Sequence, residues 1–419
     1  MKTKLHTLSA VAALLAATAT AQSTWNGGTG DYNTAGNWTP SGVPGFSNEV
    51  IINSGTAVLS SGGDLLFERG ANTTINGGNL DITDYRFLNG RGGPATFNLQ
   101  DGSVTQSGTY FIVAQNNAGT FNQSGGTVTL DLRRGFFLTD GAAGSNTGTY
   151  NLTGGTLDVS LNGSEANSDA HNVWLGRSTA GSDLLHVDGG TFNLRNSGTL
   201  GTTDKRFYIT RDSTFQIDSG TVDIDGMTFF SIGRGVSTGT ESNFLVNGGD
   251  TTIDVTTAFV VGGGTDGRME LTDGIIRIRE SNNGGGDVWV ADTSSTDSGV
   301  IIQSGGIFDI EGDLILGRNA AATTASYTMT GGELIASDIF LGANTNALFD
   351  FSGGLITLAG DRTDIVGETW FNGAAGTFAS FDGVNTTIAI PEPSTLVLMA
   401  VFLTALSTTS LRRRLRILR

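Results

Sequence analysis

The chain has 419 residues, no cysteine, 63 glycines and a formal net charge of −17. An acidic chain repels nucleic acid and anionic lipid, so these numbers argue against a nucleic-acid-binding protein. The lack of cysteine excludes a disulfide scaffold, and the many glycines predict many turns.

The N-terminus has the layout of a secretory signal peptide. Lys2 and Lys4 precede an apolar stretch at 8–17, and Ala19 and Ala21 form a small-x-small cleavage site. We therefore predict a signal peptide over 1–21 and a mature chain that begins at Gln22. That mature chain up to residue 390 carries 16 basic and 39 acidic residues, a net charge of −23.

The segment 22–60 is expected to hold an N-terminal cap and the first strands. Trp25, Tyr32 and Trp38 lie there among Gly, Asn and Pro, which do not favour a helix. We expect the three rings to cover the first open coil of a repeat fold. The alternative is an exposed aromatic platform that stacks against sugars.

An internal repeat extends over 61–358 and determines the expected architecture. Its motif is an apolar pair, a small polar residue, two glycines and an alternating strand, as in YNLTGGTLDV at 150. The second glycine or its counterpart recurs about every 28 residues, at 78, 102, 126, 155, 190, 220, 249, 274, 306, 332 and 354. Period-two flanks on both sides of a glycine turn predict strand, turn, strand.

A second turn precedes several of these motifs and adds a third strand to each coil. It has the same sequence pattern in three places, Leu175-Gly176-Arg177, Ile232-Gly233-Arg234 and Leu316-Gly317-Arg318. Three strands per repeat predict an all-β fold, a parallel β-helix (β-solenoid) of about eleven rungs, with small polar side chains stacked before the glycine pairs. The repeats also resemble the Gly-rich β-helix passenger repeats of autotransporter-like proteins.

No residue pattern in the repeats identifies a reaction, although the same fold is used by polysaccharide-cleaving enzymes. Three residues after the second glycine, the rungs carry Asp81, Thr105, Thr129, Asp158, Asn193, Asp223, Thr252, Arg277, Asp309, Ile335 and Thr357, with no two neighbouring Asp. Catalysis by carboxylates needs the opposite, a cluster. We therefore predict a protein that is not an enzyme and has no cofactor or metal; a polysaccharide-binding or polysaccharide-cleaving role is the alternative.

Two sets of residues leave a ligand site open. Arg177, Arg234 and Arg318 either pair with carboxylates, which we favour, or form a basic stripe for an anionic glycan. His171 and His186 are the only histidines beyond the signal peptide, and they lack partners at metal-ligand spacing in the sequence. We expect them to be surface and strand residues.

The repeat pattern decays after residue 358, so 359–390 is expected to be a C-terminal cap and linker. The tail, 391–419, then has three parts: Pro391, Glu392 and Pro393; an apolar run over 395–411; and the arginines 412, 413, 414, 416 and 419. The run is slightly short for a membrane span, but arginines on the cytoplasmic side would fix its orientation. A buried core helix is disfavoured because five arginines have no place in a core.

This tail resembles the PEP-CTERM sorting signal of exported bacterial surface proteins. The resemblance implies a transmembrane helix, transient insertion in the inner membrane, and processing by an exosortase-like protease after passage through the export machinery. The residues that carry it are Pro391, Glu392, Pro393, Arg412, Arg413 and Arg414. The chain is therefore expected to be a membrane-anchored precursor first and a cell-surface or extracellular protein afterwards, with extracellular polysaccharide as a possible partner.

Overall fold

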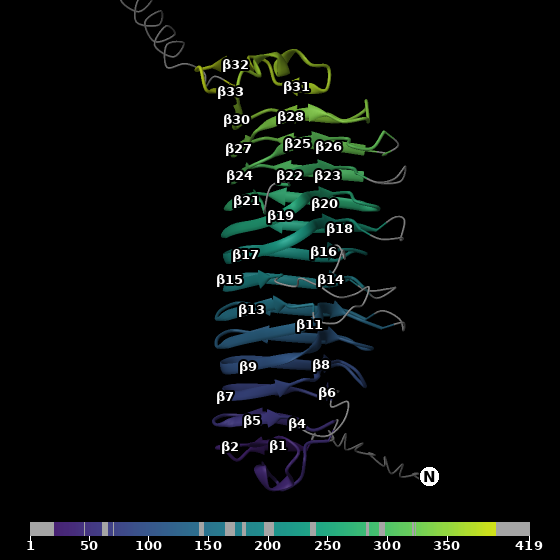
Figure 1. Cartoon of the computed structure of the whole chain (residues 1–419), viewed down its shortest axis with the longest axis vertical. Coiled ribbons are helices and arrows are strands. Elements are labelled where there is room, and N and C mark those ends of the chain that lie inside the picture. Colours follow the sequence, from purple (N-terminus) through teal and green to yellow (C-terminus); the bar gives the residue numbers. More distant parts are fainter. Residues whose placement is uncertain are drawn as a thin grey trace, which may run out of the picture.

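The computed structural model describes residues 21–45, 47–60, 66–69, 71–141, 146–163, 172–177, 182–196, 205–234, 240–281, 285–292, 298–320, 322 and 324–390, with only the backbone at 66–69. These residues form a single parallel β-solenoid, a rod in which the strands stack from the N-terminal to the C-terminal end (Figure 1). The predicted fold class is confirmed.

Each coil passes through three faces, and each face is a ladder of parallel strands. The first face, before the glycine pair, contains β1 Gln22–Trp25, β4 Glu49–Ile52, β10 Gly119–Gln123, β12 Gly148–Leu152, β18 Glu241–Val246, β20 Asp266–Leu271, β23 Ser298–Gln303, β26 Thr324–Met329, β29 Leu348–Phe351 and β31 Phe371–Gly373. The second face, after the pair, contains β2 Thr29–Asp31, β5 Thr56–Leu59, β13 Thr156–Leu161, β21 Ile275–Glu280, β24 Ile307–Ile310, β27 Glu333–Ala336 and β30 Leu355–Ala359.

The third face leads into the Leu-Gly-Arg turns. It contains β6 Leu66–Arg69, β8 Arg86–Asn89, β14 Asn172–Leu175, β16 Arg206–Ile209, β22 Asp287–Val290, β25 Asp313–Leu316 and β28 Asp338–Leu341. Six longer strands bend around the corners: β7 Thr73–Thr83 and β15 Leu184–Arg195 join the first two faces, β11 Thr127–Thr139 and β19 Asp250–Val261 join the last two, and β9 Ala95–Ala114 and β17 Thr214–Ile232 run through all three.

The interior is one continuous apolar core in which equivalent side chains of successive coils stack. On the first face Phe121 lies between Phe97 and Tyr150, with ring centroids 4.6 and 4.7 Å apart and nearly parallel planes. All three rings are fully buried. Period-two alternation therefore places the core, as the sequence predicts.

The glycine turns need backbone that only glycine adopts without strain. Gly155 has φ +77°, and a Cβ there would lie 2.3 Å from the carbonyl oxygen of Gly126 in the preceding coil. In two coils, at Asn76 and Asp188, the first glycine of the pair has the positive φ instead, which corrects the expected pattern. The small polar column before the pairs does stack: Asn247 Nδ2 donates to Asp218 Oδ1 at 2.8 Å, and Thr272 Oγ1 donates to Asn247 Oδ1 at 3.0 Å.

Two kinds of buried polar side chain tie coils together inside the rod. Tyr150 Oη donates to Gln123 Oε1 at 2.6 Å, and Gln123 Nε2 donates to the carbonyl oxygen of Thr156 at 2.9 Å. The pair recurs about three-quarters of the way along the chain, where Tyr327 donates to Gln303. Burial raises the pKa of both tyrosines well above its ordinary value.

Asp183 is the second kind. Its carboxylate is buried and accepts hydrogen bonds from Thr139 Oγ1 at 2.8 Å and from the backbone N–H groups of Gly148 at 2.8 Å and Gly176 at 2.6 Å. Burial raises the pKa of Asp183 to about 6, and these hydrogen bonds act in the opposite direction. The side chain thus ties together segments up to 44 residues apart.

The N-terminal end holds more of the solenoid than the sequence predicts. The rod has about twelve turns, because β4 and β5 form a coil around Gly55, which has φ +74° like the repeat turns. Beyond it, β1 and β2 continue the first two ladders, and β3 Trp38–Thr39, after the 3₁₀ turn η1 Ala35–Asn37, pairs antiparallel with β1.

The three aromatic residues of this end are buried, with exposed fractions of 4% for Trp25, 6% for Tyr32 and 1% for Trp38. Trp38 Nε1 donates to the carbonyl oxygen of Tyr32 at 2.7 Å. Because no ring face is open, the alternative of a sugar-stacking platform is wrong for these residues.

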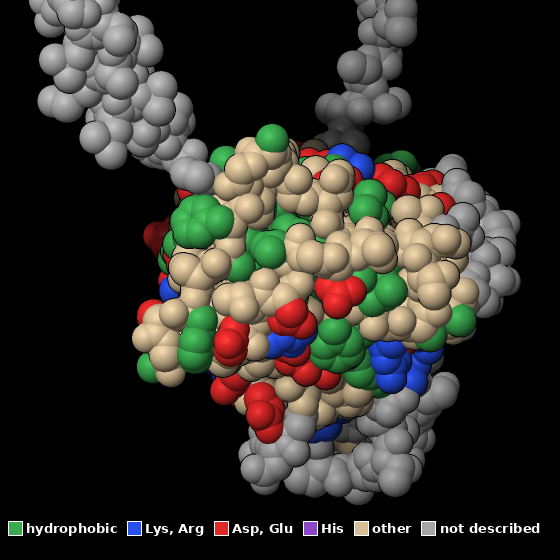
Figure 2. All heavy atoms as spheres, turned by 90° about the horizontal axis from the view of Figure 1, so that it is seen from above, with side chains coloured by type: hydrophobic (Ala, Val, Ile, Leu, Met, Phe, Trp, Pro, Cys, Tyr) green, Lys and Arg blue, Asp and Glu red, His purple; other side chains and the backbone are tan. Residues whose placement is uncertain are grey.

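Antiparallel strands also end the rod at its C-terminal side. After the 3₁₀ helix η2 Thr363–Gly367, β32 Phe378–Phe381 pairs with β33 Asn385–Ala389, and β33 pairs antiparallel with β30. Figure 2 looks onto this end and shows hydrophobic side chains at its surface; the exposed ones in this segment are Val366, Phe378, Phe381 and Val384.

Candidate functional site

The residues predicted for export and sorting lie almost entirely outside the described residues. This holds for Ala19, Pro391, Glu392, Pro393, Arg412, Arg413 and Arg414. Ala21 is described and exposed, and its carbonyl oxygen accepts a hydrogen bond from the N–H of Glu49. Within the described part, no helix is long and apolar enough to cross a membrane.

The polar column of the second face lies as the sequence predicts. Asp158 pairs with Asn193, Asn193 pairs with Asp223, and the whole series from Asp81 to Thr357 is in register. Arginine side chains neutralise two of its carboxylates, with Arg195 bonded to Asp223 and Arg279 bonded to Asp309. This column is a solvated face without adjacent aspartates.

A carboxylate cluster that the sequence reading missed lies beside this column. Burial, followed by the charges of Asp225 and Asp223, raises the pKa of Asp254. Lys205, whose pKa burial lowers, feels the charge of Asp225 and donates to the carbonyl oxygen of Asn196 at 3.1 Å. The signal was available, because Asp225 and Asp254 both lie five residues after their turn glycines, at 220 and 249.

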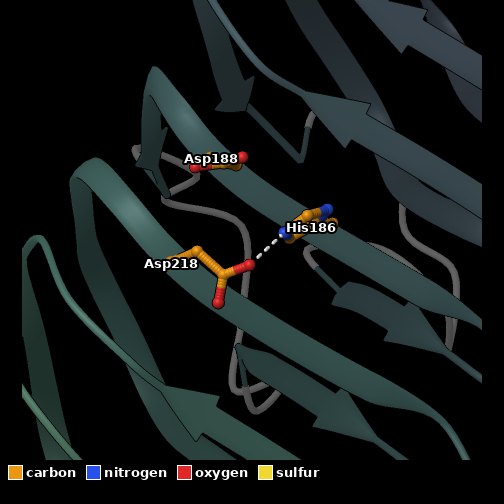
Figure 3. Close-up of side chains that lie close together, drawn as sticks. All are labelled: His186, Asp188 and Asp218. Carbon is orange, nitrogen blue, oxygen red and sulfur yellow. Dashed lines mark hydrogen bonds and ion pairs between the residues drawn. The ribbon is translucent and has the colours of Figure 1, made fainter.

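His186, Asp188 and Asp218 form the described group with metal-ligand chemistry, and one ligand atom of each lies within 4.8 Å of the others (Figure 3). His186 Nε2 lies 2.7 Å from Asp218 Oδ2. Asp218 also accepts from Gln216 at 2.9 Å and Asn247 at 2.8 Å. Burial alone would raise the pKa of Asp218, but these donors outweigh it and lower the pKa.

This group is better explained by the hydrogen-bond column than by an ion. The oxygens of Asp218 already face side-chain donors from its own and both neighbouring coils, and Ser219 Oγ donates to Asp188 Oδ1 at 3.0 Å. His186 is a surface strand residue, as expected; His171 lies outside the described residues.

Two of the three arginines that follow the second turn pair with carboxylates, as we favoured, and the third does not. Arg177 pairs with Asp140 at 2.7 Å, and Arg318 pairs with Asp292. Arg234 instead donates to the carbonyl oxygen of Gly263 at 3.0 Å, so the expectation of carboxylate partners is confirmed for two of the three. Arg177 and Arg318 also lie over aromatic rings, those of Phe137 and Trp289.

Those rings belong to an outer stripe on the third face, a feature that the sequence reading did not anticipate. The stripe consists of the outward side chains Leu88, Ile112, Phe137, Trp174, Tyr208, Ser231, Val260, Trp289, Ile315 and Phe340, one per coil and in register. It contains two apolar clusters separate from the inner core, one around Phe137 and one around Trp289.

A pocket of about 350 Å³ opens in the outer stripe at the cluster around Trp289. Its lining includes Arg206, Tyr208, Ser231, Trp289 and Arg318. The pocket combines cations, aromatic walls and a buried hydroxyl, and it is the described surface feature best suited to hold a small ligand.

Comparison with known proteins does not extend this picture: no family model, no curated protein and no solved structure matches the chain.

Proposed function

We propose that the chain is an exported bacterial surface or extracellular-matrix protein with a structural or adhesive role and without catalytic activity. The observation that carries the proposal is the position of the rod. The solenoid begins with β1 at Gln22 and ends with β33 at Ala389, so it fills the interval between the predicted signal peptide and the PEP-CTERM-like tail. A stacked rod with closed ends and an acidic surface supports a spacer or scaffold.

The tail supplies the first test of this proposal. Pro391 and Pro393 prevent a helix from continuing back into the rod, which would leave the Pro-Glu-Pro segment extended and open to an exosortase-like protease. We expect the surface-extracted protein to lack everything beyond the Pro391 region. Replacing Arg412, Arg413 and Arg414 with Ala should leave uncut precursor, because the orientation signal is lost.

Mass spectrometry of the C-terminus decides this test. A mature protein that ends at Arg419 would contradict sorting and make the tail a permanent anchor. A matched variant, Arg362→Ala, removes an arginine that pairs with Asp338 in the rod, and it should leave processing intact.

A polysaccharide-cleaving role is the second candidate, and the carboxylates around Asp254 favour it. A carboxyl group with a raised pKa is a possible general acid. The full-length protein in detergent should nevertheless produce no new reducing ends and no unsaturated products from a panel of glycans. Turnover that disappears in Asp254→Asn but persists in Asp309→Asn would overturn the non-enzymatic proposal.

A further inference from the structure

The pocket in the outer stripe exists because neighbouring coils carry small side chains there. In the outer stripe, Tyr208 of one coil is followed in the next three coils by Ser231, Val260 and Trp289. In the neighbouring outward column, Phe229 is followed by the small Ala258 in the next coil. The aromatic stack is interrupted for two coils, and the space left behind is the pocket of about 350 Å³.

The charges of the pocket are opposite to those of the protein. Three guanidinium groups, of Arg206, Arg234 and Arg318, face one carboxylate, that of Asp292. Asp292 is bonded to Arg318, and Arg234 has no carboxylate partner among the described residues, so the pocket holds an unneutralised positive charge on a chain of net charge −17. In a chain with so many more acidic than basic residues, such a charge makes the pocket a local site for an anion.

Among the described residues, two buried donors in the pocket wall have no acceptor. Ser231 is 2% exposed and its Oγ makes no hydrogen bond; Trp289 is 9% exposed and its Nε1 makes none. An indole N–H can only donate, and a hydroxyl can donate as well. A buried donor without a partner destabilises the folded protein, so two of them in one pocket point to a ligand that supplies an acceptor.

We propose that this pocket binds an oxyanion group, a carboxylate or a sulfate, carried by an acidic saccharide. The cation Arg234 would hold the charge, and Ser231 Oγ and Trp289 Nε1 would donate to the oxyanion. The faces of Tyr208 and Phe229 would contact the apolar side of the sugar ring. The saccharide rests on the proposed extracellular function, since carboxylated and sulfated glycans are the anions of that setting; the oxyanion rests on the pocket alone.

The experiment uses the full-length chain in mild detergent and follows tryptophan fluorescence and calorimetric heat. The probes are an oligogalacturonate, a sulfated oligosaccharide, a neutral oligosaccharide of the same length and inorganic sulfate. We expect one or both acidic oligosaccharides to bind and the neutral one not to bind. The arm that binds identifies the oxyanion as carboxylate or sulfate ester.

Three variants test the assignment to this pocket. Arg234→Gln should weaken binding at least tenfold, whereas Arg277→Gln, which removes one positive charge next to Asp250 on another face, should leave binding unchanged. Ser231→Ala should weaken binding a few-fold, yet leave the unliganded protein as stable as before or raise its melting temperature, because an unpaired buried donor is lost. This pair of opposite changes separates a ligand role from a structural one.

Several results would overturn the proposal: equal binding of the neutral oligosaccharide, binding of inorganic sulfate only, binding of none of the probes, or equal weakening by Arg234→Gln and Arg277→Gln. None of these results bears on tail processing, so the pocket can fail while the exported scaffold stands. Conversely, uncut precursor on the cell surface would contradict the sorting of the tail and leave the pocket proposal standing.

Discussion

The second and third faces of the rod obey the same stacking rule but treat their outward side chains differently. On the second face inward and outward residues alternate, and the outward column from Asp81 to Thr357 is solvated and polar except at Ile335. On the third face of several coils both directions are buried, as in Phe207, Tyr208 and Ile209, which are all less than 4% exposed. Stacking alone does not decide what a column does; the identity of the outward side chain decides it.

The second face requires one pattern of apolar residues in the sequence, whereas the third face requires two. The second face needs only apolar residues at every other position. The third face needs an inner apolar column and, in addition, an outer one covered by arginine side chains, as Arg177 covers Phe137 and Trp174. The outer apolar column is interrupted locally at Ser231, and the candidate pocket lies at this interruption.

Breaking the stack at a turn should have the largest effect. We predict that Gly155→Val destabilises the rod by about 5 kcal/mol or more, because a Cβ meets the Gly126 carbonyl oxygen at 2.3 Å and φ is +77°. Thr156→Val, one residue on and partly exposed, should change stability by less than about 0.5 kcal/mol. Urea denaturation followed by circular dichroism measures both, and equal effects at the two sites would contradict the register.

Removing one ring from each layer compares the inner core with the outer stripe directly. Phe121→Ala should cost about 3–5 kcal/mol, because it leaves a cavity between Phe97 and Tyr150 in a closed interior. Trp174→Ala, on the half-buried outer side, should cost about 1–2 kcal/mol, since solvent and the side chain of Arg177 can fill the space. A larger loss at Trp174 would mean that the outer stripe, and not the interior, holds the coils together.

The sequence predicted the first two faces well and the third poorly, for a physical reason. Where one side of a strand is wet, alternation is a strong signal, and Tyr150 and Leu152 are inward as expected. Strands buried on both sides show runs of apolar residues instead, as in Phe136-Phe137-Leu138, and such runs predict burial without telling which side chain faces the core. The pocket depends on which coil breaks the outer stripe, and Ser231 signals that break only once its register with Tyr208 and Val260 is known.

Buried polar contacts were also beyond sequence reasoning, because their partners lie in other coils. Asp183 contacts Thr139, 44 residues earlier, and no local pattern joins the two. The Gln123 and Tyr150 contact does have a signal, since the same Gln-then-Tyr succession recurs at Gln303 and Tyr327, one repeat apart in each case.

The pH dependence of stability tests the buried carboxylate. The pKa of Asp183 is raised by burial to about 6 in the folded protein, above its unfolded value of 3.8. The folded state therefore binds the proton more tightly, and this contribution to stability is full below about pH 4 and is lost as the pH rises through 6, a loss on the order of 2–3 kcal/mol.

The amide side chain in the Asp183→Asn variant cannot ionise, so this variant should not lose that contribution to stability as the pH rises. The measurement is the difference in unfolding free energy between wild type and variant at pH 4, 5, 6 and 7. We expect the wild type to lose stability relative to the variant as the pH rises. A difference that stays constant, or that shifts toward the wild type, would show that the folded carboxylate titrates at or below its ordinary pKa and that the hydrogen bonds from Gly148 and Gly176 outweigh burial.

The smallest expected effect is at the hydrogen bond inside the stack. Tyr150→Phe keeps the ring between its neighbours but removes the hydroxyl that donates to Gln123 Oε1, which leaves a buried acceptor unpaired at a cost of about 1–2 kcal/mol. Tyr327→Phe removes the same bond to Gln303 in the C-terminal half and should cost a similar amount, because both side chains are fully buried. The two sites are far apart, so the double variant should lose the sum of the two costs within about 0.5 kcal/mol. A neutral effect at both sites would mean that water pairs with the glutamines. A double variant that loses much less than the sum would show that coils at opposite halves of the rod do not unfold as one unit.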